Sequence, residues 1–404
     1  MSANQPASLG AAAVRPLRAP VQVNWQRLNT IAIALLAIGL IGLVAALGAG
    51  QADRVWQTWL VNLLYFMGIA QAGVVCSCAF YLVQGRWAGS VPYRLAESFW
   101  LFLPLAVVLF AGVFIGRDHI FPWITHPLPP NRTVWLNVPF LFARDGAALL
   151  IMALLSAWFV GASRGPDAVR WTNSASDIEM PPPALRRLAP IIAILYCFTY
   201  SLFAFDLVMS LSPQWHSTLF GWWFFATCFW SAAVAMAFSA VQFRRLLGPG
   251  NAFTAPTILH DYGKLVFAFS VFWIYLSFAQ YLVIWYGDFP AETFFLLVRL
   301  WHAPWSPLGW LAPILIWVVP FTVLMSVRSK KTPRILGTVA VLGLIGVWDL
   351  YYILIVPALS PNKLPFGWVE LCVTAGFLGA FILCALPGLR IVASAAAPGA
   401  DGGE

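Results

Sequence analysis

Ionisable residues inside long apolar runs are the part of this sequence that could do chemistry. Arg144 and Asp145 are adjacent in the stretch LFARDGAALLIM, and single acids interrupt other apolar runs at Asp206, Asp349 and Glu370. A charged side chain in membrane hydrocarbon is costly, so it is retained mainly where it binds an ion, passes a proton or pairs with another charge. These residues therefore predict either a proton-handling network or an ion pair that fixes helix packing.

The overall composition places these charges in a membrane. Of the 404 residues, 61% are hydrophobic and only 9% are charged, and the mean hydropathy is +0.81. Ordinary soluble domains contain about 25% charged residues. We therefore expect an all-α polytopic membrane protein, multi-pass in the cell inner membrane and surrounded by lipid. The net charge of +8 is explained by membrane orientation, and no nucleic-acid partner is predicted.

Ten apolar runs are long enough to cross a bilayer, which takes about 20 residues. They cover residues 30–49, 59–83, 98–116, 137–161, 189–211, 218–242, 264–286, 309–327, 335–357 and 367–389. The basic residues predict their orientation, because Lys and Arg in short loops remain on the cytoplasmic side. With the amino terminus inside, seventeen of the 23 basic residues lie on the inner side. Arg144 lies within the membrane, and the outer side holds Arg54, Arg117, Arg132, Arg299 and Lys363. Both termini are therefore predicted to be cytoplasmic.

This orientation gathers most of the intramembrane acids in the outer half of the bilayer. Arg144 and Asp145 lie roughly 11 Å below the outer end of their helix, at a rise of 1.5 Å per residue. Neighbouring residues on a helix point about 100° apart, so these two cannot simply neutralise each other. At least one needs a partner on another helix, and Asp206 and Glu370 are the nearest candidates by depth.

Further polar residues could extend a path for protons through the membrane. Glu97 and Lys264 lie near the inner ends of their predicted helices and could form an inner polar entrance. Hydrogen-bonding side chains within the helices could continue it, although each is also common as a contact between helices. The candidates for a proton path are Arg144, Asp145, Asp206, Asp349, Glu370, Glu97, Lys264, Tyr200, Tyr275 and Gln280.

Cysteine and histidine placement predicts no metal or haem on this chain. The six cysteines fall within predicted helices without a C-x-x-C motif, so an iron–sulfur cluster is not expected. All five histidines lie in loops or at helix ends, where they cannot ligate a haem between helices. The sequence also lacks a G-x-x-x-x-G-K-[ST] motif, which argues against an ATP-driven pump. No catalytic residue is predicted.

Two long outer segments, residues 117–136 and 287–308, are rich in Trp, Pro and His. Long loops often carry binding surfaces, which predicts a docking face for a partner. An aromatic belt at the membrane interface explains the Trp content nearly as well. The candidate docking residues are His119, His126, Trp215, His216, Glu292, Arg299 and His302.

Three stretches resemble the ActF subunits of bacterial alternative complex III, which belong to the NrfD/PsrC-like group of quinone-associated membrane subunits. They are FDLVMSLSPQWHSTLFGWWFF at 205–225, HDYGKLVFAFSVFWIYLSFAQYLVIWYGDFPAETFFLLVR at 260–299 and WDLYYILIVPALSP at 348–361. With residues 56–100, the resemblance covers most of helices 2 to 10. It implies two four-helix bundles at 53–212 and 213–358. A tail (1–28) and helix 1 (29–52) precede them, and helix 10 with its tail (359–404) follows.

The resemblance also implies a function and partners. Complexes of this family oxidise quinol, for this chain menaquinol, and pass electrons to cytochrome c or another soluble carrier. The partners would be a homologous membrane subunit (ActC) that holds the better-attested quinol site, an iron–sulfur subunit (ActB), haem c subunits and small membrane subunits. The chain itself would bind no cofactor and would serve proton translocation and assembly.

Two other classes of function remain open. A secondary transporter or ion channel would bind its substrate near the midplane, on helices broken by Gly or Pro. The predicted mid-helix breaks are weak, with Pro139 and Pro320 near helix ends, which favours the oxidoreductase subunit. The third class is a pure scaffold, because none of the buried charges has to move.

Overall fold

The computed structural model describes residues 23–85, 89–125, 128, 130–174, 179–247, 251, 253 and 255–396. Within these residues the regular structure is entirely helical. The long helices are α1 (Trp25–Gly48), α2 (Ala52–Leu82), α4 (Phe102–Ile115), α8 (Val138–Ser163), α10 (Pro183–Phe203), α11 (Phe220–Leu246), α12 (Pro256–Gly287), α17 (Pro333–Leu359) and α18 (Trp368–Ala395). The shorter helices are α3 (Val91–Ala96), α5 (Arg117–Ile120), α6 (Pro122–Thr125), α7 (Pro130–Thr133), α9 (Pro166–Asn173), α13 (Pro290–Leu300), α14 (Ser306–Pro313), α15 (Val319–Val323) and α16 (Val327–Lys331).

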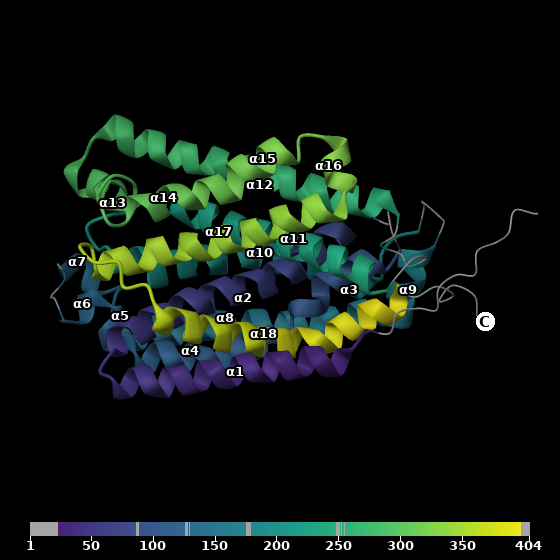
Figure 1. Ribbon diagram of the computed structural model, residues 1–404, viewed down its shortest axis with the longest axis horizontal. Helices are drawn as coiled ribbons and strands as arrows, with labels where there is room; N and C mark the ends of the chain where they lie inside the picture. Colours follow the sequence, from purple (N-terminus) through teal and green to yellow (C-terminus); the bar gives the residue numbers. More distant parts are fainter. Residues whose placement is uncertain are drawn as a thin grey trace, which may run out of the picture.

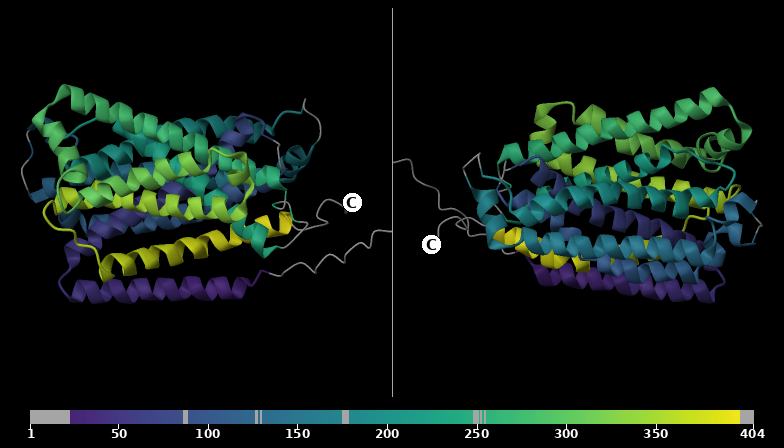
Figure 2. Two further views of the ribbon diagram at one scale, coloured as in Figure 1. Left: turned by 45° about the horizontal axis from the view of Figure 1, so that its top comes forward. Right: turned by 180° about the vertical axis from the view of Figure 1, so that it is seen from behind.

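Ten helical segments among the described residues are long and apolar enough to cross a membrane. Seven are single helices, and three combine shorter pieces at Val91–Ile115, Pro183–Leu211 and Ser306–Val323. The prediction of an all-α polytopic membrane protein with ten spanning helices is confirmed. The spans run side by side, and the start of α1 and the end of α18 lie at the same end of the molecule (Figures 1 and 2).

Several spans are longer than predicted, because their ends contain charged residues that the apolar runs exclude. The second span begins at Ala52, not at residue 59, and includes Arg54 in its first turn. The third begins at Val91, not at residue 98, and includes Arg94 and Glu97. These charges are paired within the protein, so the helices continue through them.

Helices α2 and α11 form the centre of the molecule. Helix α2 packs against α4, α10, α11, α17 and α18, and α11 also packs against α12. Helix α2 consequently has buried polar side chains at Gln57, Thr58, Asn62, Gln71 and Ser77. Interhelical contacts in a membrane rely on such side chains, because the hydrophobic effect does not separate helices from lipid. The polar interior of the protein therefore follows α2.

The first and last spans form a close pair along most of their length, as Figure 1 shows. Gly39 of α1 faces Gly376 of α18, and a Cβ added at Gly39 would collide with the backbone of Gly376. Small residues allow helix backbones to approach within a membrane. This pair therefore depends on glycine at the crossing.

Three spans contain irregular turns, so the prediction of weak mid-helix breaks is wrong. The 3-10 turn η1 (Glu97–Phe99) separates α3 from α4. The π turn η2 (Ala204–Val208) and the 3-10 turn η3 (Met209–Leu211) follow α10, and the π turn η5 (Ile314–Val318) follows α14. Pro320, which follows η5, has no N–H to donate to the preceding turn. Two of the breaks contain a buried acid, Glu97 in η1 and Asp206 in η2.

Candidate functional site

Arg144 of α8 pairs with Asp206 in the π turn η2 of the neighbouring span. The Arg144 Nη2 and Nε atoms both donate to Asp206 Oδ2, at 2.6 and 2.9 Å. Depth along the helices predicted Asp206 or Glu370 as the partner of Arg144, and the structure pairs Arg144 with Asp206. Two charge-assisted hydrogen bonds from one guanidinium make this a strong contact between helices.

Aromatic side chains enclose this ion pair. Trp135 Nε1 donates to the other carboxylate oxygen of Asp206, Oδ1, at 2.8 Å. The Arg144 guanidinium lies 4.0 Å from the ring centre of Trp135 and 4.4 Å from that of Phe140, within cation–π range. Asp206 therefore has partners on both carboxylate oxygens, and these contacts join α8 to the turn η2.

Asp145 lies beside this pair and differs from Asp206 in its contacts. Its side chain is fully buried, and neither carboxylate oxygen has a hydrogen-bond partner among the described residues. Its nearest cation is Arg144, whose Nε lies 3.8 Å from Asp145 Oδ1 and is already directed at Asp206. Asp145 thus differs from Asp206 in having no hydrogen-bond partner on either carboxylate oxygen.

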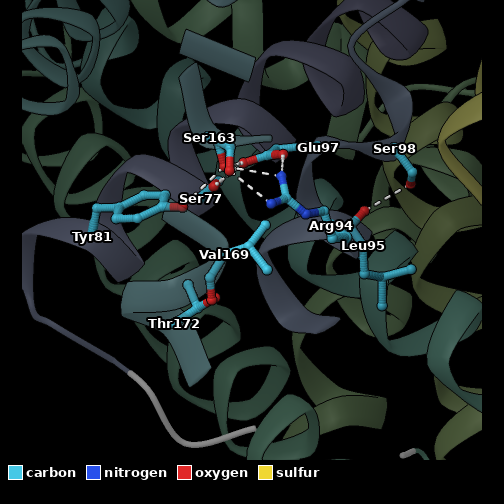
Figure 3. A network of polar contacts seen from close by, with 9 residues as sticks. All are labelled: Ser77, Tyr81, Arg94, Leu95, Glu97, Ser98, Ser163, Val169 and Thr172. Carbon is cyan, nitrogen blue, oxygen red and sulfur yellow. Dashed lines mark hydrogen bonds and ion pairs between the residues drawn. The ribbon is translucent and has the colours of Figure 1, made fainter. Parts of the chain in front are cut away.

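A second buried acid, Glu97, accepts a hydrogen bond from Ser163, at the other end of α8 from Asp145. Figure 3 shows the polar contacts around it. Ser77 and Ser163 donate to Glu97 Oε1 at 2.8 and 2.5 Å, and Arg94 Nη1 lies 3.2 Å from Oε2. Arg94 Nη2 also donates to the Ser163 carbonyl at 2.7 Å, and the Tyr81 hydroxyl lies 3.0 Å from Ser163 Oγ. We call Ser77, Tyr81, Arg94, Glu97 and Ser163 the Glu97 cluster.

A second cation lies near the Glu97 cluster. Arg164 follows Ser163 at the end of α8, and its Nε is buried without a hydrogen-bond partner among the described residues. Burial lowers the pKa of Arg164 from its usual value, while the negative charge of Glu97 opposes that shift. The positive charges of Arg94 and Arg164 thus both lie near the Glu97 carboxylate.

Helix α8 links the two acids. Ser163 and Asp145 are 18 positions apart on one helix, which is about 27 Å at 1.5 Å per residue. Between them, Ser156 on the same helix exchanges hydrogen bonds with Gln71 of α2 at 3.0 and 3.3 Å. Tyr200 lies farther along, where its hydroxyl donates to the Met67 carbonyl at 3.0 Å. Buried polar groups therefore occur at intervals between the Glu97 cluster and Asp145.

The other proton-path candidates lie away from the buried polar groups between the Glu97 cluster and Asp145. Glu370 pairs with Arg54, whose Nε and Nη2 donate to it at 2.9 and 2.5 Å, and not with Arg144. Asp349 is buried in α17, and no contact joins it to Arg144 or Asp206. Lys264 is 56% exposed and pairs with Asp261 at 2.5 Å, so it does not join Glu97 in a buried entrance.

Tyr275 and Gln280, the remaining candidates, lie on α12 away from the Asp145 side. Tyr275 is 65% exposed, which directs it toward lipid. Gln280 lines a cavity of the second half of the chain, and its Oε1 is buried without a hydrogen-bond partner among the described residues. Neither residue extends a hydrogen-bonded chain to Asp145.

The predicted docking residues divide into exposed and buried sets. Trp215 and Arg299 are only 2% and 5% exposed, so they cannot form a docking surface. Trp215 stacks on Phe295 with ring centres 3.7 Å apart, which explains its burial. The exposed His119 and His216 lie 2.6 Å from Asp53 and 3.9 Å from Glu292, respectively. His302 is exposed as well, and His126 lies outside the described residues.

Sequence reasoning missed several members of these sites, namely Arg54, Arg94, Ser77, Ser163, Trp135, Gln71 and Ser156. One signal was present, because Arg94 and Glu97 have the i, i+3 spacing at which helical side chains meet. The serines gave no signal, because a lone Ser in an apolar helix usually bonds its own backbone. Arg54 was assigned to the outer surface from its place in the sequence.

Neither the comparison with known proteins nor the residue types of the chain identify a functional class. No protein-family model matches the chain, and no curated protein sequence matches it. Among the described residues, no group of three or more His, Cys, Asp or Glu side chains could hold a metal ion. The arrangement offers two buried acids at opposite ends of α8, of which one is fully paired and one, Asp145, is not.

Proposed function

We propose that the chain is a cofactor-free membrane subunit of a quinol:electron-acceptor oxidoreductase, similar to ActF of alternative complex III, and that it conducts protons. The observation that carries the proton role is the contrast between Asp145 and Asp206. Both are buried beside Arg144, but only Asp206 has hydrogen-bond partners on its carboxylate. A relay needs a group whose charge is not fixed by its partners, and Asp145 meets that requirement.

The route runs along α8 and α2. A proton enters at the Glu97 cluster, passes the Ser156–Gln71 pair, and reaches Asp145 near the opposite end of α8. Ordered water would bridge the intervals, since the separation of about 27 Å exceeds what these side chains span directly. Quinol oxidation releases protons, so a path of this kind in a neighbouring subunit can move them away from the reaction.

The assignment to an oxidoreductase rests on the resemblance to ActF in residues 205–225 and 260–299. The resemblance implies two four-helix bundles flanked by the first and last spans. The distribution of basic residues supports cytoplasmic termini, and we place the chain in the cell inner membrane. The partners would be ActC-like and ActB-like subunits, haem c subunits and small membrane subunits. Menaquinol would be oxidised in the complex, and the electrons would pass to cytochrome c or another soluble carrier.

A secondary transporter or channel is the second candidate, and the irregular turns favour it. Transporter sites often use spans whose helices are interrupted near an ionisable residue. Two interrupted spans here contain Glu97 and Asp206. Both acids are fully paired by protein groups, however, which leaves no free ligand for a transported ion.

Purification of the tagged full-length chain from membranes in mild detergent separates these classes. The oxidoreductase proposal predicts co-purification of subunits carrying haem c and iron–sulfur clusters, together with quinol oxidation by the purified material. A chain that purifies without redox partners, and that transports an ion when reconstituted alone, is a transporter. The complex could also form and oxidise quinol while Asp145→Asn leaves proton transfer across the membrane unchanged. In that case the chain would be a scaffold.

A further inference from the structure

A large apolar cavity lies between α11, α12, α14 and α17, next to α13. Its volume is about 620 Å³, which is within the range of ligand sites in proteins. Its walls are mainly apolar and include the aromatic side chains of Trp223, Trp273, Phe295 and Trp317. Exposed lining residues, among them Tyr275 and Phe278, mark its opening on the outer face of α12. In a membrane-spanning chain this opening faces lipid hydrocarbon.

Arg299 supplies a positive charge at the edge of this cavity. Pro357 interrupts α17 and cannot donate to the Ile353 carbonyl one turn earlier, which leaves that oxygen without its helical partner. Arg299 Nε donates to this carbonyl at 2.9 Å, and Nη2 donates to the Leu354 carbonyl at 2.9 Å. Nη1 donates to the Phe295 carbonyl at 3.0 Å. The proline therefore explains why an arginine is buried here.

The charge of Arg299 is not balanced by any acid in the part of the chain that the structure describes. No Asp or Glu of those residues lies within ion-pair distance of it, although the side chain is only 5% exposed. Burial lowers its pKa to about 9, so it remains protonated at neutral pH. Three of the five N–H donors of the guanidinium are used by carbonyls, which leaves two. A buried charge is costly without a counter-charge, so the surroundings favour an anion at this position.

Arg299 also borders a second, smaller space at the end of the molecule. This hollow of about 230 Å³ is lined by Arg299 and Phe295, and also by Ser212 and Gln214. Arg299 and Phe295 thus form the wall between a hollow that contains polar side chains and a cavity that is apolar. An amphiphile fits this arrangement, because its anionic head group can lie in the hollow beside Arg299 and its hydrocarbon chain in the apolar cavity.

We propose that this cavity binds one anionic phospholipid, whose phosphate pairs with Arg299 and whose acyl chain fills the space between α12, α14 and α17. The lipid comes from the leaflet at the α13 end of the molecule, opposite the end of the molecule at which α18 ends (Figure 1). Phosphate is a good partner for a guanidinium because it accepts two N–H bonds at once. Gln280, whose Oε1 is buried on the same cavity wall, accepts a hydrogen bond from a hydroxylated head group.

The test is native mass spectrometry of the delipidated full-length chain, titrated with phosphatidylglycerol or with phosphatidylcholine of identical acyl chains. We expect one phosphatidylglycerol to bind at least about tenfold more tightly than phosphatidylcholine. Both lipids carry a phosphate that can accept hydrogen bonds from Arg299, but the choline cation of phosphatidylcholine cancels the net negative charge that would balance the buried guanidinium. Equal affinity for the two lipids would overturn the proposal. Retention of a neutral isoprenoid in place of either phospholipid would overturn it as well.

Three variants locate the site. Arg299→Gln should remove the preference for the anionic head group, and Arg299→Lys should keep most of it. Ile274→Trp, which fills the cavity from α12, should weaken binding of the anionic lipid about tenfold. Val283→Trp on the exposed face of the same helix is the matched control and should have no effect. If Ile274→Trp and Val283→Trp behave alike, the lipid binds elsewhere and the assignment is wrong. If Arg299→Gln fails to fold, the head-group comparison on the unmodified chain and the Ile274→Trp result still decide the outcome.

Discussion

Arg144 on α8 donates two hydrogen bonds to the same oxygen of Asp206, and its sequence neighbour Asp145 receives none. Two buried acids that share one arginine are thus placed in different electrostatic surroundings. Asp206 also accepts a bond from Trp135, so both of its carboxylate oxygens have partners. The ion pair joins α8 to the π turn of the next span, while neither oxygen of Asp145 is hydrogen-bonded.

Replacing the two acids should therefore have different effects on stability. Asp206→Asn leaves the Arg144 charge buried without its partner, and we expect a loss of about 3 to 5 kcal/mol, as is typical when one member of a buried pair is removed. Asp145→Asn should destabilise the chain less, because Asp145 lies 3.8 Å from the Arg144 Nε and accepts no hydrogen bond from it. Thermal unfolding of the detergent-solubilised chain measures both. Equal destabilisation by the two variants would contradict the assigned roles.

The Glu97 cluster should depend more on its carboxylate than on either serine. Glu97→Gln removes the counter-charge of Arg94, so we expect a loss of roughly 3 kcal/mol or more in the free energy of unfolding. Ser77→Ala removes one hydrogen bond and should cost about 1 to 3 kcal/mol. Unfolding of the two variants by the same thermal assay checks the order. A larger effect of Ser77→Ala than of Glu97→Gln would show that the ion pair is not the main contact.

The glycine crossing between α1 and α18 gives a prediction about packing. Gly39→Ala places a methyl group against the Gly376 backbone, which cannot move aside, and should cost about 1 to 3 kcal/mol. Gly48→Ala on the same helix is the control, since nothing lies within 4 Å of its added Cβ. Thermal stability of the two variants is the measurement. A Gly39→Ala variant as stable as Gly48→Ala would mean that the two helices do not cross at this glycine.

Membrane orientation can be tested with cysteines at exposed positions. With cytoplasmic termini, a membrane-impermeant thiol reagent applied from outside should label His119→Cys and Phe289→Cys, both of which are exposed. It should not label Val169→Cys in α9, which is exposed at the opposite end. The reverse labelling pattern would invert the predicted topology.

The sequence predicted the number of spans well, because a membrane helix must satisfy its own backbone and so needs a long apolar run. It predicted their ends less well. The apolar runs stop before the charged residues Arg54, Arg94 and Glu97. In the structure Arg54 pairs with Glu370 and Arg94 pairs with Glu97, so the helices extend through them. A hydropathy pattern contains no information on such partners.

The pairing of Arg144 with Asp206 was partly predictable from the sequence. Depth along the helices placed Asp206 near Arg144, and the structure brings them together. Depth also proposed Glu370, but depth does not determine which side of a helix faces which neighbour. Glu370 faces Arg54 instead. The π turn at Asp206 could not be anticipated, because nothing in the stretch AFDLV distinguishes it from a regular helix.

Proton release during quinol oxidation tests the central claim most directly. The assembled complex is reconstituted in vesicles, and quinol oxidation and proton release are recorded separately for the unmodified chain, Asp145→Asn and the exposed control Asp118→Asn. We predict that Asp145→Asn assembles normally but delivers fewer protons to the outer side of the membrane per quinol oxidised, while Asp118→Asn matches the unmodified chain. Asp145→Asn complexes that release protons and oxidise quinol at unmodified rates would contradict the proposed relay.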